Sequence, residues 1–356
     1  MAAREIAPEL QKLFDEGAEV YSISRLNCIN QCEYQAYLSY IEKAPKKSNV
    51  WSNLGGKIHD ALEKCVKDGA NESIIKDAIQ DELDNLDILD IDFPLDRNGN
   101  PTIRNNWIAN MTRFAEEFKT PKGKFETEKL VLLNWKDNIW IQGYIDLIRH
   151  DKNGSVYILD WKTSSQFDKA HLVEAGRQLV LYALAMQEEG YKVSRVSWIM
   201  LKYCITTWIQ KNGKPKEKIS EWRNYIKDLR NVLEKRLSDM GYDEVDIDAL
   251  LFQAEKENSM ACLPKELQEQ FKTRPYVRDY DLTPEVIAEC KQYIDDSIAK
   301  YRECGTDEKN FKPCNIEKES FFCASLCDFS GSCKYWKDYC EQFKSKDDSE
   351  DEDDLF

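Results

Sequence analysis

The sequence has no long apolar run and no excess of positive charge. Crossing a bilayer takes about 20 consecutive apolar residues, and no such run occurs among the 356 residues. The 50 lysines and arginines are outnumbered by 65 aspartates and glutamates, which gives a net charge of −15. We therefore expect no membrane span, and we do not expect nucleic-acid binding through bulk positive charge.

Three further absences narrow the class of protein. The first twenty residues lack the basic stub and apolar run of a secretory signal, so we expect a cytoplasmic protein. No phosphate-binding loop of the G-x-x-x-x-G-K-[ST] type occurs, which excludes an ATPase of that kind. No internal repeat is evident. In a reducing compartment, the 12 cysteines are not expected to form a disulfide framework.

Apolar periodicity predicts an α/β protein. Helical patterns cover residues 1–20, 21–41, 51–69, 71–92 and 104–119, with Ser22 or Ser24 as a cap and the third helix entered through Gly55–Gly56. Alternating or continuous apolar residues then predict strands at 125–135, 138–150 and 155–164 as an antiparallel meander. A helix at 174–191 and a strand at 193–204 follow. Such an order gives a sheet with helical additions.

We divide the chain into five parts. They are an N-terminal helical segment (1–50), a core (51–210), a mostly polar helical extension with a loop at 211–218 (211–303), a cysteine region (304–343) and an acidic tail (344–356). Seven of the last ten residues are acidic. The composition of this tail predicts disorder.

Two acids and a lysine occupy the second and third predicted strands. Asp160 and Lys162 project from one face because strand side chains alternate, and Trp161 projects from the other. Pairing of the two strands brings Asp146 beside Asp160. A lone pair of this kind is usually a surface salt bridge, but here the charges interrupt the apolar run 157–159, and buried charges need partners. Two close carboxylates and a lysine favour a site for Mg²⁺ or Mn²⁺ that hydrolyses phosphodiesters.

Four motifs in order carry a family resemblance. They are G-G-K-I-H (55–59), G-Y-I-D (143–146), D-W-K-T (160–163) and Q-L-V-L-Y (178–182). The series resembles the RecB-type branch of the PD-(D/E)XK nucleases over residues 22–205. The resemblance implies a restriction-endonuclease-like fold, in which a mixed β-sheet core is flanked by helices.

The resemblance also implies the roles of individual residues. The metal ligands would be His59, Asp146, Asp160 and the Trp161 carbonyl, and the catalytic group would be Lys162. Gln178 and Tyr182 would face the scissile region and the DNA backbone. Glu126 matches a less constant acid of the family.

The cysteines gather near the end of the chain. A metal site needs four thiolates, or thiolates with imidazoles, and Cys323, Cys327 and Cys333 supply only three. RecB-type nucleases with an iron–sulfur cluster, including the AddB-type subunit and CRISPR-adaptation nucleases, take a fourth cysteine from upstream, and here this implies Cys32. The first gap departs from the commoner C-x2-C, so Cys314 and Cys340 stay open as ligands. Zinc is the alternative to a [4Fe–4S] cluster.

These observations together predict a metal-dependent DNA nuclease. We expect an exonuclease acting on single- or double-stranded DNA ends in recombination, repair, phage DNA processing or CRISPR adaptation. The alternative is a non-catalytic DNA-end-binding or interaction module held together by the same cysteines. The acidic tail ends in Leu355–Phe356 and could dock on a replication or recombination protein.

Overall fold

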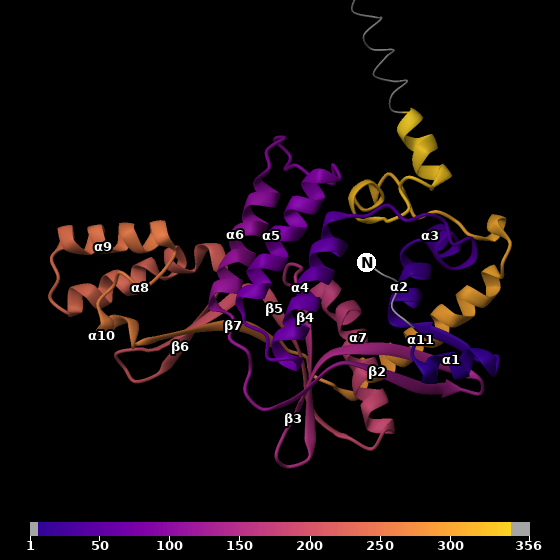
Figure 1. Ribbon diagram of the computed structural model, residues 1–356, viewed down its shortest axis with the longest axis horizontal. Helices are drawn as coiled ribbons and strands as arrows, with labels where there is room; N and C mark the ends of the chain where they lie inside the picture. Colours follow the sequence, from indigo (N-terminus) through magenta and orange to yellow (C-terminus); the bar gives the residue numbers. More distant parts are fainter. Residues whose placement is uncertain (1–5, 343–356) are drawn as a thin grey trace, which may run out of the picture.

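The computed structural model describes residues 6–342, with the side chain of residue 170 excepted. Its described strands form one seven-stranded mixed sheet, with helices on both faces (Figure 1). The order along the sheet is β1-β3-β4-β5-β6, while β2 also pairs with β3 and β7 with β5. The strands are β1 (Glu19–Ser22), β2 (Lys124–Lys136), β3 (Ile139–His150), β4 (Ser155–Lys162), β5 (Lys192–Ile209), β6 (Pro215–Glu221) and β7 (Phe271–Asp279).

The centre of the sheet confirms the predicted meander. β2, β3 and β4 follow one another in antiparallel pairs. β5 then lies parallel to β4, and the chain between them passes through the long helix α7 (Lys169–Glu188). A parallel neighbour requires such a long crossover because the chain must return to the starting edge of the sheet.

Helices cover the two faces. The remaining α-helices are α1 (Pro8–Asp15), α2 (Ile23–Gln31), α3 (Glu33–Ala36), α4 (Val50–Lys67), α5 (Ser73–Ile88), α6 (Thr102–Glu117), α8 (Tyr225–Asp239), α9 (Glu244–Glu257), α10 (Lys265–Gln268) and α11 (Pro284–Cys304). Short helical turns lie at Tyr37–Ile41, Trp222–Asn224, Glu308–Asn310 and Phe322–Leu326. Among the described residues, no helix combines the length and the apolar character that a membrane span requires.

The main hydrophobic core lies in two layers, one on each face of the sheet. One layer contains α4, α5, α6 and α8, and the other contains α2, α7 and α11. Alternation along β4 assigns its side chains to these layers: Leu159 and Trp161 join the first, and Ile158 joins the second. Asp160 and Lys162 therefore project toward α7.

Three local expectations differ from the structure. α1 covers only part of residues 1–20, and β1 follows it; Ser22 caps α2 as predicted. The third helix does not begin at Gly55–Gly56, because Asn49 caps α4 one residue before Val50. β6 and β7 also lie within residues 211–303, where only helices and a loop were expected.

The two missed strands have little apolar alternation. β6 begins with four exposed residues, and β7 carries Pro275 among charged side chains, as edge strands do. They form because β5 is long and offers both of its edges for backbone pairing. The boundaries of the five predicted parts stay a prediction.

Candidate active site

The two acids meet where β3 and β4 end their pairing. The register joins Leu147 to Leu159, so Asp146 and Asp160 come next in line on the two strands. The Trp161 backbone N–H donates a hydrogen bond to Asp146 Oδ2 at 2.8 Å. Asp160 is 1% exposed and Asp146 is 9% exposed. Folding thus places both carboxylates in a poorly solvated site.

Lys162 neutralises part of this charge. Its ammonium forms an ion pair with the buried Asp160 Oδ2 at 2.7 Å. Burial by itself lowers the pKa of Lys162, but the charges of Asp160 and Asp146 outweigh burial and raise it. Lys162 is therefore a cation at neutral pH.

The pKa of Asp146 rises well above its usual value of 3.8. Burial is the main cause, and the charge of Asp160 adds to it. A group in this state holds its proton until a cation compensates the carboxylate.

His59 brings an imidazole to the same place from α4. Its Nδ1 lies 3.6 Å from Asp146 Oδ2, and its ring meets the Trp161 ring edge-on. Burial lowers the pKa of His59, although the charge of Asp160 opposes the shift. A neutral imidazole is the form that can ligate a metal ion.

Gln178 and Tyr182 form a hydrogen-bonded chain behind the lysine. Lys162 Nζ donates to Gln178 Oε1 at 3.0 Å, and Gln178 Nε2 donates to the Tyr182 hydroxyl at 2.7 Å. That hydroxyl donates to the Tyr144 carbonyl at 2.5 Å. One helical turn separates Gln178 from Tyr182, so α7 presents both along one line. This series of hydrogen bonds holds the Lys162 ammonium beside Asp160.

Two acids of β2 lie near this part of the sheet, and the role suggested for Glu126 stays a prediction. Glu126 lies opposite Ile148, and its carboxylate is 3.3 Å from His150 Nε2. Glu128 lies between Thr127 and Lys129, whose partners Leu147 and Ile145 flank Asp146. It sits at a kink with φ of 52°, and its charge raises the Asp146 pKa. A bulge between Asn134 and Lys136 shifts the register by one residue, so counting back from the turn would have placed Lys129, rather than Glu128, opposite Asp146.

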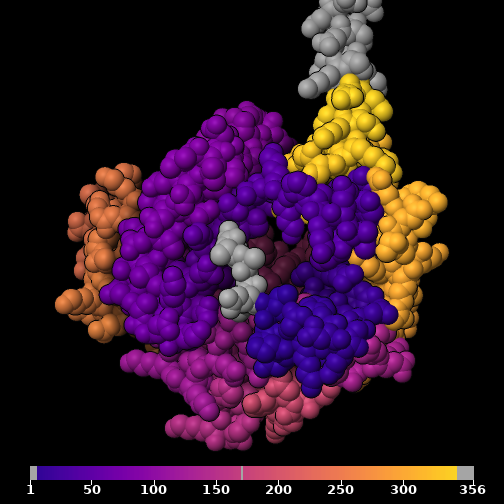
Figure 2. All heavy atoms as spheres, turned by 45° about the vertical axis from the view of Figure 1, so that its right-hand side comes forward, coloured from indigo at the N-terminus to yellow at the C-terminus, as the bar shows by residue number. Residues whose placement is uncertain are grey.

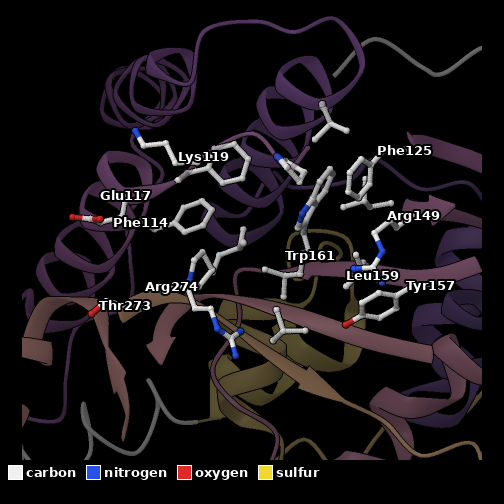
Figure 3. Close-up of a pocket in the computed structure, with 18 residues that line it drawn as sticks. Phe114, Glu117, Lys119, Phe125, Arg149, Tyr157, Leu159, Trp161, Thr273 and Arg274 are labelled. Atoms are coloured by element: carbon white, nitrogen blue, oxygen red, sulfur yellow. The ribbon is translucent and has the colours of Figure 1, made fainter. Parts of the chain in front are cut away.

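Two cavities flank this part of the sheet. The first, of about 580 Å³, lies beside Lys162 and Gln178 and is lined by polar and apolar residues of α2, α7 and the loop that joins β4 to α7. The second, of about 420 Å³, lies on the other face; Figure 3 shows Trp161, Phe114 and Phe125 around it. The first cavity suits a polar substrate because the acid–lysine pair projects to its side. The Trp161 ring lines the second cavity, whereas the Trp161 backbone N–H contacts Asp146.

The cysteines gather at a separate place. Five thiols line a small cavity between the N-terminal segment and the C-terminal region: Cys32, Cys314, Cys323, Cys327 and Cys333. Cys314 Sγ lies 3.7 Å from Cys323 Sγ, and the Cys314 N–H donates to Cys32 Sγ at 3.3 Å. Cys340 does not line this cavity. Folding thus brings together the four cysteines suggested by the resemblance and adds Cys314.

Burial controls the protonation of these thiols. It raises the pKa of Cys327 to about 12, and neighbouring thiolates at Cys32 and Cys323 add to the shift. Thiols in this state stay protonated until a soft metal ion replaces their protons. As the side chains stand among residues 6–342, no three His, Cys, Asp or Glu groups are arranged to hold a metal ion.

Comparison with known proteins identifies the family. Residues 20–334 match the model of the PD-(D/E)XK nuclease superfamily, so the chain belongs to that superfamily. Its mixed sheet flanked by helices is consistent with the restriction-endonuclease-like fold that was predicted. Nucleases of this superfamily typically use Mg²⁺ or Mn²⁺.

No curated protein matches the sequence. A solved structure titled "Crystal structure of SSO0001" is 12% identical, with a TM-score of 0.31 over 91% of this chain and 93% of that chain.

Proposed function

We propose that this protein is a divalent-metal-dependent DNA exonuclease of the RecB type. The observation that carries the proposal is the meeting of Asp146, Asp160 and Lys162 at the end of β4, beside a neutral imidazole. The proposed biological context is one of four processes: recombination, repair, phage DNA processing or CRISPR adaptation.

The donor set suits a hard divalent cation. Asp146 and Asp160 offer buried carboxylate oxygens, and the His59 Nδ1 lies 3.6 Å from Asp146 Oδ2. His59, Asp146, Asp160 and the Trp161 carbonyl are the proposed ligands. A cation bound there would activate water and stabilise negative charge on a phosphate.

The protein's own groups would orient the reaction. The Lys162 ammonium would hold the attacking water and offset charge on the phosphate, since it stays protonated at neutral pH. Gln178 would fix the lysine through its hydrogen bond. Tyr182 is 3% exposed and would act by orienting Gln178.

The shape of the molecule favours action at DNA ends. Figure 2 shows a hollow bordered by the indigo N-terminal segment and the purple helices that follow residue 50. A strand enters a hollow with walls around it more easily by its end than along its length.

We further propose that Cys32, Cys323, Cys327 and Cys333 hold a [4Fe–4S] cluster, with zinc as the alternative. The support is their position on one cavity and the buried, protonated state of thiols such as Cys327. Ligation here would join the N-terminal and C-terminal segments. Metal analysis of anaerobically purified protein, with its visible absorbance, distinguishes iron–sulfur from zinc.

End-labelled DNA tests the catalytic proposal. We expect cleavage of single- or double-stranded substrates in Mg²⁺ or Mn²⁺, and none in chelator. Lys162→Met and Asp160→Asn should each lower the rate at least about a hundredfold while leaving the circular dichroism spectrum unchanged. Circular DNA of the same sequence is the control, because an exonuclease requires a DNA end and should leave the circle intact. Full activity in either variant contradicts the site assignment, and end binding without cleavage by the wild type supports the non-catalytic alternative.

A further inference from the structure

The linker that leads into α4 lies against the cysteine region. Residues 42–49 run from the N-terminal segment to α4, close to the yellow C-terminal segment in Figure 1. The Lys47 N–H donates to the Asp328 carbonyl at 2.6 Å. Ser332 Oγ donates to the Pro45 carbonyl at 3.2 Å, and the Lys46 ammonium lies 5.8 Å from the centre of the Phe329 ring. The linker is thus attached at several points to the segment that contains Cys327 and Cys333.

Asn49 makes the most specific of these connections. Its Oδ1 accepts from the backbone N–H groups of Trp51 and Ser52, which caps α4. Its Nδ2 donates to Asp328 Oδ1 at 2.6 Å. A side-chain amide can perform both tasks because it carries an acceptor and a donor. An aspartate could cap but could not donate, and a serine could cap but is too short to repeat the second contact.

Each end of this connection is joined along the chain to a candidate site. Asp328 directly follows Cys327, which lines the thiol cavity. α4 begins directly after Asn49 and carries His59, whose Nδ1 lies 3.6 Å from Asp146 Oδ2. A helix moves largely as one unit, so a displacement of its capped end displaces His59 as well.

We propose that Asn49 and Asp328 are positioning residues that couple metal occupancy of the cysteine site to divalent-cation binding at His59. The inference rests on the two metal sites of the proposed function. Ligation of Cys327 would hold Asp328 in place, and Asp328 would hold the cap of α4. Loss of the thiol-bound metal would free this segment and weaken the placement of His59. Because coupling is reciprocal, cation binding would in turn stabilise the loaded cysteine site.

Calorimetric titration with Mn²⁺ tests the coupling without any measurement of cleavage. We compare full-length protein with its cysteine site loaded and emptied, in the wild type and in Asn49→Ser. Ser48→Ala is the matched control, because it changes an exposed neighbour that donates to none of these groups. In the wild type, emptying the site should weaken Mn²⁺ binding about fivefold or more.

Asn49→Ser should keep the cap of α4 and remove the hydrogen bond to Asp328. Serine keeps the cap, so we expect an unchanged helical spectrum and an unchanged metal content at the cysteines. The ratio of Mn²⁺ affinities between loaded and emptied protein should fall close to one, and Asp328→Ala should do the same. If emptying the cysteine site unfolds the protein, the metal-loaded proteins alone test the coupling. In that comparison, either variant should bind Mn²⁺ several-fold more weakly than the wild type.

The outcomes separate this inference from the proposed function. Wild-type affinities in both variants overturn the coupling, as does equal Mn²⁺ affinity in loaded and emptied wild type. If Asp160→Asn also leaves Mn²⁺ binding unchanged, the proposed active site fails together with the coupling. Protein that takes up neither iron nor zinc overturns the cysteine site and the coupling with it.

Discussion

The residues at the end of β4 control one another's protonation. Asp160 raises the pKa of both Asp146 and Lys162, so the site contains one acid inclined to hold a proton and one firmly protonated lysine. The lysine can therefore orient water or offset charge, but it does not supply a free base at neutral pH. These shifts arise from burial and proximity, which no residue carries by itself.

The raised pKa of Asp146 predicts a pH-dependent stability. Folded protein keeps a proton that the unfolded chain, with the usual value of 3.8, releases earlier. The resulting stabilisation is complete below the unfolded pKa and is lost as the pH rises through the folded pKa. In chelator, the free energy of unfolding should therefore fall over this interval by more in the wild type than in Asp146→Asn. Urea unfolding at a series of pH values measures the difference.

Added Mn²⁺ provides the control for this prediction. A cation competes with the proton on Asp146, so its stabilising effect should grow with pH in the wild type. Equal pH slopes in the wild type and Asp146→Asn would show that the carboxyl has no raised pKa.

At the scale of elements, the packing of β3 against α7 holds the site together. Gly143 lies on β3 where the Tyr182 ring crosses it, and a Cβ there would come 2.6 Å from Tyr182 Cε1. The ring is buried and its hydroxyl is engaged, so it has little room to move. The glycine of the G-Y-I-D motif thus permits the Gln178–Tyr182 chain to reach Lys162.

Gly143→Ala should therefore destabilise the protein by about 1–3 kcal/mol and lower activity. The expected cause is displacement of Tyr182, and urea unfolding measures the loss. Gly55→Ala is the matched control, because a Cβ there meets Thr163 Oγ1 at an ordinary 3.6 Å and α4 gains helix propensity. Equal stability of Gly143→Ala and the wild type would refute the close contact.

Some helices and strands could be predicted from the sequence and others could not. The meander β2–β4 and the helix α7 were predicted because their apolar residues repeat with clear periods. β6 and β7 were missed because their pairing with β5 depends on backbone groups rather than on apolar side chains. Glu128 was missed for a similar reason, since its place beside Asp146 follows from strand register.

At the scale of the whole molecule, the cysteine region joins the two ends of the described chain. Cys32 lies in the N-terminal segment, yet it shares a cavity with residues 314–333. Tyr34 and Glu308 add a hydrogen bond of 2.9 Å between the same regions. Metal ligation at the proposed cysteine site would close a long loop, restrict the unfolded chain and add the free energy of metal binding to that of folding.

Cys327→Ala should thus remove the bound metal and lower the unfolding temperature by about 5 °C or more. Thermal unfolding and metal analysis of the same preparation measure both effects. Cys340→Ala should change neither, because Cys340 does not line the cavity. Metal content and stability of Cys327→Ala equal to those of the wild type would remove Cys327 from the ligand set. The predicted role of the acidic tail falls on residues outside 6–342.

The sequence alone predicted the class of protein and the candidate reacting groups. Periodicity predicts the central elements, and the four motifs name His59, Asp146, Asp160 and Lys162, because residue chemistry and spacing along one chain are local properties. Tertiary structure decided what depends on distance in space. It brought the charge of Glu128 to bear on Asp146, added a fifth thiol to the cysteine cavity and connected that cavity to α4. Such contacts join residues far apart in the chain, and only folding sets the distances and burial that give them their energies.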